Sequence, residues 1–263
     1  MNIKYIKITV GLLWVAFLFP SCEKEIQVNL HSSEACIVIE GQIQLDSLAI
    51  VKITESKDYN TDNTYNKING AIVSVSDSEG NNEILSQNAD GYYVAQNIRG
   101  RASRTYHLSV IIGDNEYTSI STLPTPVPID TITMYDIPSL GYPFPMVVFQ
   151  DPPVEKNYYR CRYYVNGKRI LIEDDLVDTK DRNGFKVERI LPVYEDQNDD
   201  KEIALGDEIK VELHAIDENV YKYFEALANI ENSLNNPTTN IRGGALGYFS
   251  AYAVDTMTIS ASW

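Results

Sequence analysis

The feature that most constrains the fold is a series of short runs in which apolar and polar residues alternate. One such run, Ile72-Val73-Ser74-Val75-Ser76, leads into the turn sequence Asp77–Asn81, and Gly113–Asn115 joins two further runs. Alternation with a period of two is typical of β-strands with one buried face. Because such runs recur with turn residues between them, the sequence predicts a mainly β fold. We expect an immunoglobulin-like β-sandwich over residues 35–123.

The residue pattern over 129–263 predicts a second β-rich domain with one α-helix. Asp217 is a suitable N-cap, and apolar residues follow it at helical spacing: Val220, Phe224, Leu227 and Ile230. We expect this helix over residues 218–234, since a proline at 237 disfavours helix just before it. The alternating prolines of residues 124–128 favour extended polyproline II and predict a stiff linker between the two domains.

The first 21 residues are typical of a secretory signal. Lys4 and Lys7 precede an apolar run from Val10 to Phe19, which is shorter than the roughly 20 residues that a membrane-spanning helix needs. The run ends in Pro-Ser before Cys22, which resembles a bacterial lipobox. We therefore expect residues 1–21 to be a lipoprotein signal peptide, Cys22 to carry the lipid, and residues 22–34 to form a tether. The alternative is ordinary secretion, with Cys22 unmodified.

Two further cysteines, Cys36 and Cys161, fall in predicted strands of different halves. The envelope compartment permits disulfides, so the two could pair and join the domains. The favoured interpretation is two buried free thiols, because cysteine behaves as a small hydrophobe in cores.

Charge and motifs exclude several functions. A net charge of −15 argues against nucleic-acid binding, which needs clustered Lys and Arg. No zinc motif, nucleophile elbow or P-loop is present, so we expect no enzyme activity, no metal and no cofactor. Asp196, Asn198, Asp200 and Asp207 have calcium-loop spacing, but Lys201 stands where that loop needs glycine. His214 alternates with Lys210 and Glu212, and we expect it to be exposed.

Two segments are candidates for a binding surface. In the predicted strand 158–165, one face carries Tyr158, Arg160, Arg162 and Tyr164. Such a face could bind a sugar by stacking or an acidic group by hydrogen bonds, and the alternative is cross-strand packing. The second segment is a glycine-rich stretch before the last strand, with Arg242, Gly243, Gly244 and Tyr248. It could line a pocket beside the helix, or serve only as a structural turn.

The order of several motifs resembles a known family. These are the lipobox with the following Glu23-Lys24-Glu25, then Val38–Gly41, Gly70–Val75, Leu123–Asp130 and Gly243–Phe249. Together they resemble an uncharacterised family of Bacteroidetes outer-membrane lipoproteins, a domain of unknown function of the 4249 type. The acidic residues after Cys22 also resemble a surface-export signal of such lipoproteins.

The resemblance implies an outer-membrane lipoprotein, often encoded near TonB-dependent receptors, and it supplies no catalytic residues. We therefore expect a lipid-anchored accessory protein that binds a ligand or partner for a TonB-dependent transporter. Two alternatives stay open: a structural or adhesive surface lipoprotein, and a hydrolase that uses a pair of carboxylates.

Overall fold

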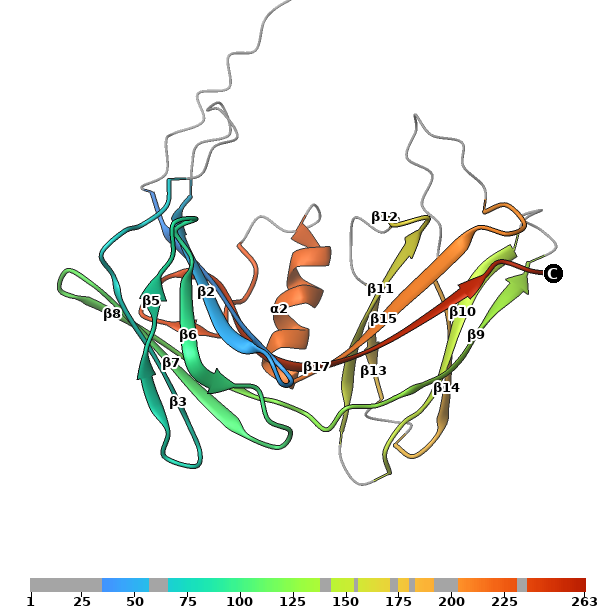
Figure 1. The fold of residues 1–263 in the computed structure, drawn as a ribbon, viewed down its shortest axis with the longest axis horizontal. Helices are drawn as coiled ribbons and strands as arrows, with labels where there is room; N and C mark the ends of the chain where they lie inside the picture. The colour runs from blue at the N-terminus through green and yellow to red at the C-terminus, as the bar shows by residue number, and fades with distance from the viewer. Residues whose placement is uncertain are drawn as a thin grey trace, which may run out of the picture. The chain divides into compact units, whose positions relative to one another are not determined.

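The structure is a computed structural model that describes residues 35–56, 66–137, 143–153, 156–170, 175–179, 183–191, 203–230 and 236–263. The prediction of a mainly β fold with several sheets is confirmed, and residues 35–263 form one compact unit. The strands are β1 (Ile37–Gln44), β2 (Leu48–Glu55), β3 (Ile72–Asp77), β4 (Asn82–Ile84), β5 (Ser86–Gln87), β6 (Tyr93–Arg99), β7 (Thr105–Ile112), β8 (Asn115–Thr122), β9 (Ile129–Asp136), β10 (Pro143–Gln150), β11 (Tyr158–Val165), β12 (Lys168–Arg169), β13 (Asp175–Asp178), β14 (Lys186–Ile190), β15 (Glu208–Ile216), β16 (Ile241–Arg242) and β17 (Leu246–Ser260). Figure 1 shows them with the described helix, α2 (Glu218–Ala228).

A nine-stranded sheet runs through both halves of the chain. Its order is β12-β11-β15-β17-β1-β2-β6-β5, with β13 also paired to β11. The last strand, β17, lies parallel to β1, with Gly41 opposite Phe249, and antiparallel to β15. The hydrogen-bonded sheet therefore joins the N-terminal and C-terminal halves directly.

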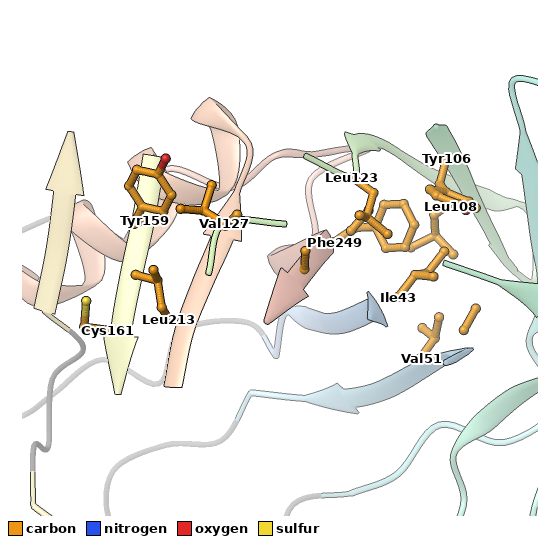
Figure 2. Packing of buried hydrophobic residues seen from close by; sticks show 14 of the residues in the cluster. Ile43, Val51, Tyr106, Leu108, Leu123, Val127, Tyr159, Cys161, Leu213 and Phe249 are labelled. Carbon is orange, nitrogen blue, oxygen red and sulfur yellow. The ribbon is translucent and has the colours of Figure 1, made fainter. Parts of the chain in front are cut away.

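Two smaller sheets share the hydrophobic core with one face of this sheet. The five-stranded sheet β16-β8-β7-β3-β4 packs there through residues such as Leu108, and the three-stranded sheet β14-β10-β9 packs through Phe149. The Phe149 ring lies 4.7 Å from that of Tyr159 on β11, edge to face. Figure 2 shows Leu108, Ile43 and Phe249 pointing into a common space. This is the sandwich-like packing of sheet on sheet.

The segment 124–128, which the sequence predicts to be a stiff linker, contacts the core through Val127, and its other residues are exposed or half-buried. Leu123 and Val127 are both buried and belong to the main hydrophobic cluster (Figure 2). Leu123 N–H also donates to the Arg104 carbonyl at 2.9 Å. The burial of these two apolar side chains stabilises the compact unit.

Helix α2 begins where the sequence predicts and ends earlier, at Ala228. The Asp217 carboxylate accepts from Val220 N–H at 2.9 Å and from the Ser121 hydroxyl of β8, so the N-cap also fixes the helix to the five-stranded sheet. Val220 and Phe224 are buried, whereas Leu227 and Ile230 are exposed.

Candidate functional site

The predicted Tyr/Arg face of β11 is half covered by helix α2. Tyr158 and Arg160 are only 8% and 7% exposed. The Arg160 guanidinium lies over the ring of Phe224, 3.7 Å from its centre, and the Tyr158 ring lies 5.1 Å from that of Tyr221. This cation–π contact holds the helix on the sheet. Tyr158 and Arg160 are core residues, and the expected open contact surface does not include them.

The other half of the face is partly exposed and packs across the strands. Tyr164 O–H donates to the Glu212 carboxylate at 3.2 Å, and Lys210 Nζ lies 4.8 Å from the Tyr164 ring. Arg162 is the cross-strand neighbour of Glu212. These contacts match the packing alternative that the sequence left open.

The prediction that His214 is exposed is wrong. It is 5% exposed, its ring stacks on Tyr252 at 5.1 Å, and Arg160 is its cross-strand neighbour. Its Nε2 lies 3.4 Å from the Glu212 carboxylate. That contact and the ion pair with Lys210 lower the pKa of Glu212 to about 2, although burial opposes the shift.

The predicted residues Arg160, Arg162 and Tyr248 do come together, around a very small cavity. Its volume is about 20 Å³, and its wall is completed by Gln42, His214, Ile216, Ser250 and Tyr252. Such a space holds about one water molecule, so it is too small for a ligand.

The glycine-rich stretch is a bent backbone in close contact with other strands, as one of the two predicted alternatives requires. A Cβ on Gly243 would lie 2.5 Å from the Glu116 carbonyl, and one on Gly247 would lie 2.1 Å from the Ile39 carbonyl. A Cβ on Gly244 would meet no atom within 4 Å. Glycine at these sites therefore lets β16 and β17 approach their neighbours.

Arg242 lines a larger groove on the outer face of the five-stranded sheet. This groove has a volume of about 630 Å³, and we call it the hydroxyl groove. It lies between the sheet, the first turns of α2 and residues 238–242. Hydroxyl, amide and cationic side chains predominate in its lining, which contains no carboxylate: Ser74, Ser76, His107, Leu108, Ser109, Thr118, Ser119, Ile120, Asn219, Lys222, Thr238, Thr239, Asn240, Ile241 and Arg242.

Sequence reasoning left open a pocket that Arg242 lines beside the helix, but it missed the sheet floor of this groove, although part of that signal was present. The outward positions of three strands that are neighbours in the sheet carry short polar side chains, among them Ser74, Ser109 and Thr118. The wall comes from residues 238–242, more than a hundred positions further along the chain. No local pattern predicts that contact.

A second groove, of about 360 Å³, contains two carboxylates, Asp77 and Glu83. Burial raises the pKa of Glu83, but hydrogen bonds from the backbone of residues 96–98 outweigh it and lower the pKa overall. Burial also raises the pKa of Asp77, but the hydrogen bonds from Asn81 and Arg104 to its carboxylate outweigh burial and lower the pKa overall. A carboxyl with a lowered pKa is ionised at neutral pH and is poorly suited to donate a proton as a general acid.

The calcium-loop residues Asp196, Asn198 and Asp200 lie outside the described residues, as do Cys22 and the signal. Asp207 is described, and its carboxylate accepts from Asn166 and from Ala204 N–H. Within the described ranges no cluster of three or more His, Cys, Asp or Glu could hold a metal. No described helix is long and apolar enough to span a membrane. Cys36 and Cys161 do not form a disulfide with each other; Cys161 is buried, as favoured from the sequence, whereas Cys36 is only half-buried.

Comparison with known families agrees with the resemblance in the motifs. Residues 23–258 match the sequence profile of DUF4249, a domain of unknown function. This chain belongs to the DUF4249 family. The match covers nearly all of the part that follows Cys22, so the DUF4249 domain includes both the nine-stranded sheet and the hydroxyl groove. No curated protein matches the chain.

Proposed function

We propose that this DUF4249 protein is a lipid-anchored outer-membrane accessory protein that binds a ligand for a TonB-dependent transporter. The hydroxyl groove is the observation that supports ligand binding. Its volume of about 630 Å³ lies within the roughly 300–1,000 Å³ typical of small-molecule sites. Its polar lining suits a ligand rich in hydrogen-bonding groups.

The anchor is supported by the sequence around Cys22. A short apolar run, a small residue and then a cysteine are what lipoprotein processing requires, and two or three acyl chains give stable membrane binding. Residues 22–34 would then tether the folded unit, which begins at residue 35.

The anchor is tested by changing Cys22→Ser in cells that express the full chain. We expect the wild-type protein to incorporate labelled palmitate and to sediment with outer membranes, and the variant to do neither. The matched control is Cys36→Ser, which should retain both label and location. Wild-type protein that carries no acyl chain would contradict the proposed anchor.

A structural or adhesive role is the second candidate, favoured by exposed isoleucines on the five-stranded sheet. Ile72 and Ile111 are cross-strand neighbours, and Ile84 and Ile120 are also exposed. Exposed apolar side chains on one sheet favour contact with another protein surface. Under this role Ile72→Ser with Ile111→Ser should reduce surface attachment of cells, whereas under the transporter role attachment should not change.

A further inference from the structure

We propose that the hydroxyl groove binds an acidic oligosaccharide, an inference that rests on the proposed ligand-binding function and names the ligand class. Four observations carry it: the row of hydroxyls on the floor, the fixed wall, the charge of the lining, and the occupied strand edge beside it.

The floor of the groove is a straight row of short polar side chains. Ser74 lies opposite Ser109, Ser109 opposite Thr118, and Thr118 opposite Arg242, across four neighbouring strands. With strands about 4.8 Å apart, this row extends over about 14 Å. It therefore presents three hydroxyls and then a guanidinium, in a line long enough for linked sugar rings. The Ser109 hydroxyl also donates to the Glu116 carboxylate beside the row at 3.0 Å.

The wall of the groove is held in place by hydrogen bonds to β17 and β8. The Asn240 amide oxygen accepts from Phe249 N–H at 2.9 Å, and its amide nitrogen donates to the Phe249 carbonyl at 2.7 Å. Thr239 Oγ1 donates to the Gly247 carbonyl, and Ser119 Oγ to that of Asn240. A site that is already ordered loses little conformational entropy when a ligand binds.

The lining is basic in a strongly acidic protein. The chain has 37 acidic and 22 basic residues, yet the groove contains Lys222, Arg242 and His107 and no carboxylate. Lys222 pairs with Glu218 at 2.8 Å. Among the described residues, none forms a hydrogen bond or ion pair with the Arg242 guanidinium, which is exposed. Arg242 is therefore placed to bind a carboxylate or sulfate of the ligand in bidentate fashion.

The pairing of β16 with β8 disfavours an acidic peptide that would add to β8 as a strand, and so favours a sugar. An extended peptide binds by adding a strand to a sheet edge. At this groove β16 already pairs with Ser119 and Thr118 of β8. The remaining contacts are side-chain hydroxyls and amides, which donate and accept as sugar hydroxyls do. Ile120 adds an exposed apolar surface for the C–H faces of the rings.

The test is isothermal titration of the lipidated protein, purified in mild detergent, with five probes. Two are acidic hexasaccharides, of galacturonic acid and of chondroitin sulfate. The others are the neutral galactose hexasaccharide, monomeric galacturonate and hexaglutamate. We expect at least one acidic hexasaccharide to bind at least tenfold more tightly than the neutral one, the monomer and the peptide.

Two variants locate the site. Arg242→Gln should weaken binding of the acidic hexasaccharide at least tenfold and leave any binding of the neutral hexasaccharide unchanged. The control Arg169→Gln, at an exposed arginine of β12, should change neither affinity. Thr118→Val removes a floor hydroxyl at constant shape and should also weaken binding. Its control is Thr133→Val on β9, and all four variants should unfold at the wild-type midpoint.

Equal binding of acidic and neutral hexasaccharides, or no effect of Arg242→Gln, would overturn the assignment of charge. If the monomer or hexaglutamate bound as tightly as the acidic hexasaccharides, the assignment of an oligosaccharide as the ligand would be overturned. Failure of every probe to bind would overturn it too. None of these results would affect the proposed role beside a transporter, because co-purification of a transporter does not depend on these probes.

Discussion

At the residue scale, Glu212 and His214 form a polar contact on β15, beside the part of the sheet that α2 covers. Glu212 has a folded pKa of about 2 against an ordinary value of 4.5. A lowered pKa means that its ionised form stabilises the fold above about pH 4.5, and this stabilisation is lost as the pH falls from there towards 2. In His214→Phe the ring can still stack on Tyr252, but Glu212 loses the contact that lowers its pKa most. We expect acid unfolding, followed by circular dichroism, to move to higher pH.

The control for this variant is His107→Phe, at an exposed position of β7. It should leave the acid-unfolding midpoint where it is in the wild type. An unchanged midpoint in His214→Phe would show that the contact with Glu212 does not stabilise the fold.

A second residue-scale prediction concerns Tyr159, whose O–H donates to the buried Asp151 carboxylate at 2.7 Å. Burial raises the pKa of Tyr159, so it stays a donor at any physiological pH. Tyr159→Phe removes one donor from a buried charge and should lower the free energy of unfolding by about 1.5–3 kcal/mol in urea. Tyr135→Phe, at an exposed site of β9, should change it by less than about 0.5 kcal/mol.

At the element scale, the pairing of β1 with β17 depends on one close backbone approach. Gly247 and Gly244 both have positive φ, 97° and 90°, but only a Cβ on Gly247 would meet the Ile39 carbonyl. Gly247→Ala should therefore lower the free energy of unfolding by about 1–3 kcal/mol more than Gly244→Ala does. Equal losses in urea unfolding would mean that backbone strain alone explains both.

The same elements show what the sequence could predict. Local alternation places Val73 and Val75 in the core, and the Asp217 N-cap predicts the start of the helix, because both depend on neighbouring residues. The parallel pairing of Gly41 with Phe249 depends on a contact across the whole chain. His214 was predicted as exposed because a strand pattern does not reveal which element covers its polar face. For the same reason the hydroxyl groove needed the structure.

At the scale of the whole molecule, residues 35–263 should unfold as one cooperative unit. The strand β1 lies between β2 and β17, so a fragment of residues 35–123 lacks one of its two neighbours and the buried Phe249. We expect that fragment to show poor NMR dispersion and no cooperative unfolding, in contrast to residues 35–263. A fragment that folds by itself would support the two-domain organisation first predicted from the sequence.

The proposed role also belongs to this scale, because a transport accessory is defined by what it assembles with. The most direct measurement is purification of the lipidated protein from native membranes in mild detergent, with quantitative mass spectrometry of every co-purifying protein. The account predicts a TonB-dependent outer-membrane receptor in a near-stoichiometric amount, and its loss from the Cys22→Ser preparation. A lipidated protein that is purified alone would contradict the account.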